Sequence, residues 1–520
     1  MVIAAPLVSD QNSAVLVAAD RAQRAGEPQL IARTLIRHPA GLWFLLAASF
    51  LLSAWASIQI WSFESTRDTD TFTVSLAAVL WLAVYLASTA RVFGTPYLLA
   101  TAYIVALAVF HFGLIAQDGF GILKVADFRG DFGRWMMLAG WYTNLALGCL
   151  GFAFAATCLY ARPPPPIAGE AAARLATSNL NRLRNLGIGL CFACIAFLAI
   201  GILQVGNILS YERLTLFFGG MDIRGVGLFT WTAPSAALAL AVSAQTRRQK
   251  RWSYATALAT LVIFLLSGNR SMALFPLLVG VVLWVKTGRQ IPILAAAGLL
   301  ALILLIIPVV GTLRDMGTYE NLSIHSIAKS SADANISSAL TELGGSAGLL
   351  AITLQTIPAQ EPYRIGASYL GYLWNIIPNV GTHLRLSRAP REIMKESPSF
   401  TEGMLRLSPS AWASVKVLGV NDALYQNYGV GFSAVAEPYF NFGYSGVVVF
   451  FLLVGFFLAR MDCNNLPLEY SWLVFASIFY WLLILTVRNE FDNFTTPASY
   501  TAISLGVWLL LRPFTPFARP

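Results

Sequence analysis

Apolar residues along this chain gather into twelve stretches that are separated by short polar segments. A helix of about 20 apolar residues crosses the ~30 Å hydrocarbon core of a bilayer, so each stretch predicts one membrane span. The predicted spans are 41–61, 72–90, 96–116, 135–160, 185–207, 225–244, 252–268, 271–286, 291–310, 435–458, 470–487 and 496–511. The seventh and eighth are short, and they also fit one helix that is broken at Gly268-Asn269-Arg270.

One polar gap is far longer than the others, because residues 311–430 separate the ninth span from the tenth. Long loops in compact proteins are usually functional or disordered. This loop contains Trp374, Trp412 and the amphipathic runs Leu340–Gln355 and Ile365–Ile377, which favour a folded helical cap on the outer surface. The pattern therefore predicts an all-α polytopic membrane protein with about twelve transmembrane helices and a large periplasmic helical loop.

These boundaries divide the chain into consecutive segments. They are a cytoplasmic N-terminal segment (1–40), helices 1–4 (41–160), a cytoplasmic linker (161–184), helices 5–9 (185–310), the large periplasmic loop (311–430), helices 10–12 (431–511) and a cytoplasmic tail (512–520). The first 38 residues lack an early apolar core, so we expect no cleavable signal peptide and insertion directed by the first helix.

Composition agrees with this prediction and charge adds an orientation. Hydrophobic residues make up 57% of the chain and charged residues only 12%, about half the share usual in soluble domains. Lys and Arg concentrate in segments such as Arg247–Arg251 and in Arg182 and Arg184, which the positive-inside rule places in the cytoplasm together with both termini. The net charge of +9 then reflects membrane orientation, and it indicates no nucleic-acid partner.

The five cysteines all lie in predicted spans or on the predicted inner face, so we expect no disulfide on the outer side. Cys191 and Cys194 have the spacing of a redox pair. On a lipid-embedded helix, two small side chains one turn apart are better interpreted as packing residues.

Several basic residues follow spans on the predicted outer side. Arg270 ends a break between two apolar stretches, and Arg314 opens the large loop. His383, Arg385 and Arg388 form a basic cluster within that loop, on an outer surface that is otherwise acidic. An arginine fork is suited to a phosphate or pyrophosphate. The alternatives are interfacial anchoring for Arg270 and Arg314 and a solvated basic surface for the cluster.

The chain re-enters the membrane through a segment that carries a carboxylate among aromatic side chains. If the tenth helix has begun by Glu437, then Glu437 and Asn441 share one face, with Pro438 tolerated in the first turn. A carboxylate at that depth is costly unless it is paired or used in chemistry. The charged loop 488–493, which begins with Arg488, is a candidate partner.

Asp68-Thr69-Asp70 offers a competing site in the first outer loop. Membrane glycosyltransferases that use polyprenyl-phosphate sugars keep an acidic pair in such a loop. Asp-x-Asp also arises often by chance, and a solvated loop is the simpler interpretation.

The approach to the tenth helix and two outer arginines together resemble the bacterial O-antigen and oligosaccharide repeat-unit polymerases of the Wzy type. The residues that carry the resemblance are Ala436-Glu437, Tyr439, Asn441-Phe442-Gly443 and Gly446 within Gly429–Gly446, with Arg270 and Arg488. Related ligases that transfer whole glycans to lipid A carry a His motif in the large loop, of which His383-Leu384-Arg385 is only a loose echo.

The resemblance implies a glycosyltransferase of the bacterial inner membrane with its active site facing the periplasm. A glycan on undecaprenyl pyrophosphate would pass to the non-reducing end of an incoming lipid-linked repeat unit, without a metal or other cofactor. Glu437 would act as base, Arg270 and Arg488 would neutralise the leaving pyrophosphate, and the other candidates would bind substrate. Those are Arg314, His383, Arg385, Arg388, Tyr428, Tyr439 and Asn441.

Membrane lipids and a separate chain-length regulator are the expected further partners. The alternatives are a flippase or other transporter of lipid-linked oligosaccharides, an O-antigen ligase and a polyprenyl-phosphate-sugar glycosyltransferase. No inverted internal repeat, the usual sign of many transporter folds, is visible.

Overall fold

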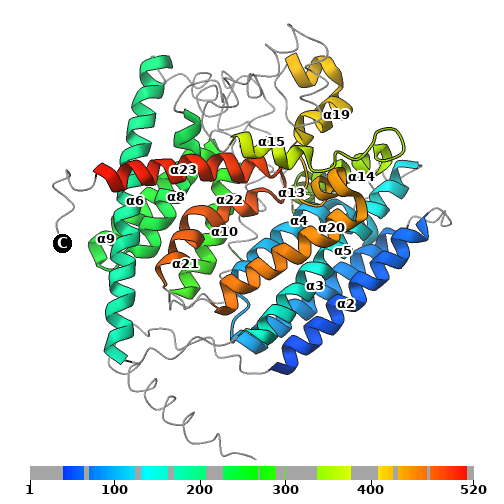
Figure 1. Ribbon diagram of the computed structural model, residues 1–520, viewed down its shortest axis with the longest axis horizontal. Helices are drawn as coiled ribbons and strands as arrows, with labels where there is room; N and C mark the ends of the chain where they lie inside the picture. Colours follow the sequence, from blue (N-terminus) through cyan, green and yellow to red (C-terminus); the bar gives the residue numbers. More distant parts are fainter. Residues whose placement is uncertain are drawn as a thin grey trace, which may run out of the picture.

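The computed structural model is built from helices throughout the part of the chain that it describes, which contains no strand (Figure 1). The described residues are 39–63, 70–122, 131–161, 169–205, 226–266, 270–287, 298, 336–375, 408–425, 431–464 and 469–511. The helical class expected from the apolar stretches is therefore confirmed for these residues.

Within the described residues, five helices are long and apolar enough to cross a membrane. They are α2 (Pro39–Trp61), α3 (Thr71–Phe93), α4 (Leu99–Gly119), α5 (Asp131–Tyr160) and the continuous helical stretch Ala436–Cys463, which contains α20 (Ala436–Ala459). Each coincides with a predicted span. Residues 291–310 lie outside the described residues except for residue 298, so the count of twelve stays a prediction.

Helix α5 lies at the centre of the first group of helices, against α2, α3, α4 and α20 (Figure 1). Buried polar side chains join these helices. The Trp81 indole donates to the Ser49 hydroxyl (3.0 Å), and the Asn144 amide donates to the Val74 carbonyl (3.1 Å). Hydrogen bonds of this kind stabilise helix pairs within a bilayer, where packing and hydrogen bonds replace the hydrophobic effect.

The second group of helices packs around α6 and α8. Its members are α6 (Gly169–Val205), α8 (Val226–Ser243), α9 (Arg247–Leu266), α10 (Arg270–Lys286), α21 (Tyr470–Val474), η5 (Phe475–Phe479), α22 (Tyr480–Leu485) and α23 (Asp492–Leu511). Figure 1 shows α23 crossing over α6 and α8, which it contacts. Helices α9 and α10 also pack against each other.

Helix α6 differs from the predicted boundaries, because residues 169–184 were expected to be linker and are helical. The reason lies in the sequence Gly169-Glu-Ala-Ala-Ala-Arg-Leu-Ala176, which consists largely of strong helix formers. The helix begins soon after Pro163–Pro166, which cannot continue a helix interior.

The described part of the large loop forms four helices: α13 (Ile336–Leu343), α14 (Gly345–Thr356), α15 (Ala367–Asn375) and α19 (Pro409–Tyr425). Helices α13 and α14 pack against α4, and α14 also contacts α5 and α20. Most side chains of α14 are buried, so this part of the loop is embedded among the long helices rather than laid on their surface.

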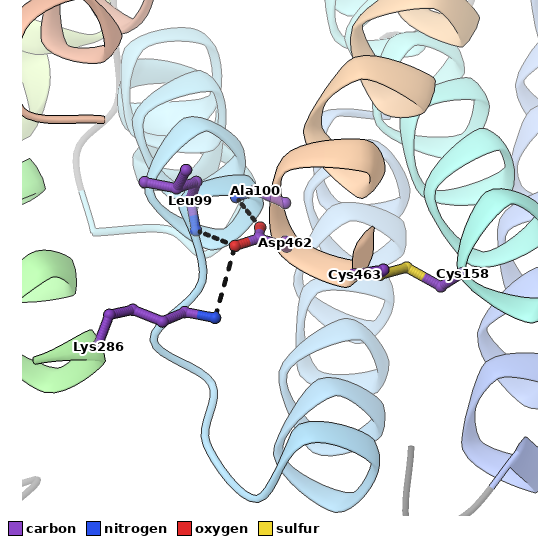
Figure 2. The surroundings of a disulfide bond; sticks show 6 residues. All are labelled: Leu99, Ala100, Cys158, Lys286, Asp462 and Cys463. Carbon is purple, nitrogen blue, oxygen red and sulfur yellow. Dashed lines mark hydrogen bonds and ion pairs between the residues drawn. A yellow bond between two sulfur atoms is a disulfide. The ribbon is translucent and has the colours of Figure 1, made fainter. Parts of the chain in front are cut away.

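A buried carboxylate joins three helices at the Asp462 end of the long stretch Ala436–Cys463 (Figure 2). Asp462 accepts hydrogen bonds from the backbone N–H groups of Leu99 (3.1 Å) and Ala100 (2.9 Å), at the start of α4. The Lys286 ammonium lies 3.7 Å from the same carboxylate. A carboxylate is well placed there because the N–H groups of a first helical turn have no partner within the helix.

A disulfide between Cys158 and Cys463 lies beside this carboxylate and joins the ends of α5 and the long stretch, with their Cα atoms 5.7 Å apart (Figure 2). The sequence alone did not indicate this pairing, since 305 residues separate the two cysteines. Cys191 and Cys194 are free thiols, and their interpretation as packing residues stays a prediction.

Candidate functional site

The first turn of α20 is held in place by a serine and a histidine. The Ser433 hydroxyl accepts from the backbone N–H groups of Val435 and Ala436, both at 3.1 Å, and lies 2.7 Å from His111 Nε2. His111 Nδ1 lies 3.0 Å from the Leu107 carbonyl, which can only accept, so Nδ1 carries the proton and Nε2 accepts from Ser433. The buried histidine on α4 thus holds Ser433, which lies one turn before Glu437 and caps the start of α20.

Helix α20 is interrupted at Gly443, which has a φ of 66° and a ψ of −147°. A Cβ at this position would lie 2.9 Å from the Tyr363 ring, and L-residues rarely adopt such a φ. The interruption leaves the carbonyls of Phe440 and Asn441 free to accept from the backbone N–H groups of Arg364 (3.1 Å) and Ile365 (2.9 Å). The large loop is thereby attached to the segment that carries Glu437.

The Glu437 carboxylate is 2% exposed and receives hydrogen bonds from two other parts of the chain. The Ser368 hydroxyl of α15 donates to Oε1 (3.1 Å), and the backbone N–H of Phe491 donates to Oε2 (2.7 Å). Asn441 donates to Ser368 Oγ (2.8 Å) and to the Glu437 carbonyl (3.0 Å). The expectation that Glu437 and Asn441 share one face is confirmed, and the 488–493 loop does reach Glu437.

One stretch of α4, at Phe110 and His111, is contacted by Arg488, by the first part of α10 and by the start of α20. The Arg488 guanidinium carbon lies 5.9 Å from the centre of the Phe110 ring, and the Phe275 ring lies 5.6 Å from the same centre. Phe275 follows Arg270, the first residue of α10, by five positions. His111, the next residue along α4, holds the start of α20. The three predicted catalytic residues therefore lie on segments that converge at Phe110 and His111.

A second buried carboxylate, after Glu437, is that of Glu490 in the loop between α22 and α23. It was not among the predicted site residues. It accepts from the backbone N–H of Ser410 (2.9 Å) and from the Ser408 hydroxyl (3.3 Å), at the start of α19. Burial raises the pKa of Glu490 to about 7, although the hydrogen bonds from Ser410 oppose the rise. Glu490 therefore attaches the start of α19 to the same loop whose Phe491 N–H contacts Glu437.

A third carboxylate, Glu361, ties the other side of α19. It accepts from the Trp412 indole (3.0 Å) and pairs with Lys416 (2.8 Å) and Arg364. Partial burial acts to raise the pKa of Glu361, but the hydrogen bonds from Lys416 and Trp412 outweigh it and hold the pKa below its usual value. Because Arg364 also bonds to the Phe440 carbonyl, this network links α19 to the segment that carries Glu437.

Tyr439 is buried among other aromatic side chains. Its ring is 6% exposed, its hydroxyl donates to the Ile357 carbonyl (3.1 Å), and the rings of Tyr142 and Tyr363 pack edge-on against it. Its assignment as a substrate-binding residue stays a prediction.

The other predicted substrate-binding residues lie outside the described residues: Arg314, His383, Arg385, Arg388 and Tyr428. Asp68 and Thr69 also lie outside. Asp70 accepts from the Thr73 backbone N–H (3.1 Å) at the start of α3, which is the ordinary function of a helix N-cap.

The residues that sequence reasoning missed are Ser368, Glu490, His111 and Ser433. Ser433 gave a usable signal, because serine before a helix start is a common cap. Glu490 lies in the charged loop 488–493, which was recognised as a whole without this residue being singled out. Ser368 and His111 gave no signal, since their partners are distant in the sequence. Among the described residues, no three His, Cys, Asp or Glu side chains gather as a metal site would require.

The chemistry of this arrangement follows from Glu437. Its two oxygens keep unused lone pairs after the bonds from Ser368 and Phe491, and the described ion pairs give it no cationic partner. A carboxylate of this kind can accept a proton from a hydroxyl group, which is the task of a general base.

Comparison with known protein families agrees with the geometry. The family model described as "O-antigen polysaccharide polymerase Wzy" matches residues 175–515, well over half of the chain, and the matched region includes Glu437, Arg270 and Arg488. No curated protein and no solved structure matches the chain. The apolar helices and the family match together make this an integral membrane protein that belongs to the O-antigen polysaccharide polymerase Wzy family.

Proposed function

We propose that this protein transfers a growing glycan from undecaprenyl pyrophosphate to the non-reducing end of an incoming lipid-linked repeat unit, at the periplasmic face of the bacterial inner membrane. The observation that carries the proposal is the buried Glu437 carboxylate, held by Ser368 and Phe491 in the first turn of α20, within the region matched by the family model.

The reaction needs a base and a stabilised leaving group. Glu437 takes the proton from the acceptor hydroxyl as that oxygen bonds to the anomeric carbon of the donor glycan. The bond between that carbon and the pyrophosphate breaks, and undecaprenyl pyrophosphate leaves with the bonding electrons. Positioned acid–base groups of this kind contribute about 10²- to 10⁴-fold to rates.

Cationic side chains would stabilise the negative charge that gathers on the leaving pyrophosphate. Arg488 and Arg270 are the candidates, because their segments meet α4 at Phe110 beside the start of α20. With the charge carried by arginines, the transfer requires no metal ion. Arg314 and the basic cluster His383, Arg385 and Arg388 remain candidates for holding lipid-linked substrate.

The test is reconstitution of the purified protein in lipid with an undecaprenyl-pyrophosphate oligosaccharide, with and without a chelator. We expect a ladder of lengthened glycans that persists in the chelator. Movement of the lipid across the bilayer without lengthening would identify a transporter instead and refute the proposal. A ladder that disappears in chelator and returns with added metal would refute the metal-independent mechanism alone.

A further inference from the structure

Three polar atoms around Glu437 are buried and have no hydrogen-bond partner among the described residues. They are the hydroxyls of Tyr369 and Tyr372 and the side-chain oxygen Oδ1 of Asn441. Buried polar atoms in folded proteins are nearly always paired, and each exception calls for a reason. Other described residues also carry such atoms, but these three lie around a single carboxylate, and Asn441 and Tyr372 are 0% and 3% exposed.

Both tyrosines lie on α15, one turn apart, on the helix that also supplies Ser368. Burial raises the pKa of each phenol well above its usual value, and the negative charge of Glu437 raises it further. The Tyr372 hydroxyl thus lies beside the Glu437 carboxylate, near enough to interact with it, but without the geometry of a formed hydrogen bond. Both phenols keep their protons, so they present O–H donors beside Glu437.

The tyrosine rings are held firmly, so the hydroxyls are preorganised. The Tyr369 ring stacks on Phe442 with a centroid distance of 6.4 Å and meets Phe491 edge-on at 6.2 Å. Tyr372 packs edge-on against Tyr369 at 6.4 Å. Fixed donors lose little conformational entropy when they bind a ligand.

The chemistry of the unused groups selects the kind of ligand. Two neutral donors, one amide acceptor and the free lone pairs of a carboxylate match neighbouring hydroxyls of an uncharged sugar, each of which donates once and accepts twice. The carboxylate would repel a pyrophosphate, so the anionic part of the donor belongs elsewhere.

From this geometry we propose that Tyr369, Tyr372 and Asn441 form, with Glu437, the subsite for the terminal non-reducing sugar of the acceptor. Tyr372 and Asn441 would orient neighbouring hydroxyls so that the reacting hydroxyl points to Glu437. The assignment rests on the proposed polymerase function and deepens it by naming where the acceptor binds.

The test uses the full-length protein in lipid nanodiscs. The probe is the free oligosaccharide repeat unit, released by mild acid from the lipid-linked pool of the producing cells, and its binding is measured calorimetrically. We expect Tyr372→Phe to weaken binding and raise KM about 3- to 10-fold, with a smaller change in kcat, and Tyr369→Phe/Tyr372→Phe to weaken binding further. Losing a hydroxyl that has no partner in the protein should leave Tm unchanged or raise it.

Tyr85→Phe is the matched control, because Tyr85 is also fully buried but its hydroxyl lies 3.2 Å from that of Thr101. Thr101 follows Ala100, whose N–H binds Asp462 at the other end of the long stretch Ala436–Cys463. This variant should lower Tm and leave oligosaccharide binding unchanged. If Tyr372→Phe does not fold, Tyr369→Phe alone provides the same comparison.

Oligosaccharide binding by the double variant that equals wild type would overturn the subsite, whether or not polymer forms. Weaker binding of sugar-free undecaprenyl pyrophosphate, with oligosaccharide binding intact, would overturn it too, because the tyrosines would then hold the pyrophosphate. Tyrosine-dependent oligosaccharide binding by a protein that makes no polymer would support the subsite and refute the proposed function.

Discussion

The long stretch Ala436–Cys463 carries one buried carboxylate near each end, and the two carboxylates have different kinds of partner. Asp462 is fully engaged, by two backbone N–H groups at the start of α4 and by Lys286 (Figure 2). Glu437 has two neutral donors and is surrounded by polar atoms without partners. A carboxylate whose charge is neutralised by the protein stabilises the fold, whereas one with unused capacity is available for a substrate.

The largest expected effect is the loss of activity in Glu437→Gln. The amide keeps the size of the side chain and can still accept from Phe491, so the fold should persist with Tm changed by only a few degrees. Without a base, polymer formation should fall by about 10²-fold or more. Glycan ladders on gels and Tm of the detergent-solubilised protein measure the two effects; normal ladders would show that Glu437 is not the base.

Asp462→Asn should do the opposite, lowering stability while sparing activity. It leaves the Lys286 ammonium buried without its charge partner, which typically costs about 3–5 kcal/mol. Tm should fall by several degrees while the protein that remains folded keeps its polymerase rate.

The double variant Asp462→Asn/Lys286→Met sharpens this prediction, because it removes the unpaired charge. We expect it to regain much of the Tm lost in the single variant. A single variant as stable as wild type would contradict the role of Asp462 as a structural link.

Gly443→Ala tests whether the interruption of α20 positions Glu437. The new Cβ would meet the Tyr363 ring at a φ of 66°, a strain of about 1–3 kcal/mol. We expect a lower Tm and a larger loss of polymer than the Tm change alone explains. Gly506→Ala in α23 is the control, since its Cβ would meet nothing within 4 Å, and it should leave both unchanged or raise Tm slightly.

The smallest expected effect is a pH dependence from Glu490. The folded protein holds a proton on Glu490 up to about pH 7, whereas the unfolded chain releases it near the ordinary value of 4.5. The unfolded state binds fewer protons in that window, so stability should fall as pH rises from 4.5 through 7. Glu490→Gln should flatten the change in Tm over this range by a few degrees; an unchanged slope would exclude Glu490 as its source.

The sequence predicted the long apolar helices because length and hydropathy are local properties. It also predicted that Glu437 and Asn441 share one face, which depends only on spacing within one helix. It could not predict Ser368, His111 or the link between Asp462 and α4, because each joins residues that are 69 to 363 positions apart. Nor could it reveal the interruption at Gly443, since a glycine in an apolar helix more often serves packing than a break.

The most direct test of the account places Glu437→Gln and Asp462→Asn side by side in one reconstituted polymerisation assay, with Tm measured on the same samples. The account predicts that Glu437→Gln retains Tm and loses the glycan ladder, while Asp462→Asn lowers Tm and retains the ladder. A ladder from Glu437→Gln, or loss of the ladder at unchanged Tm in Asp462→Asn, would contradict the division between a reactive and a structural carboxylate.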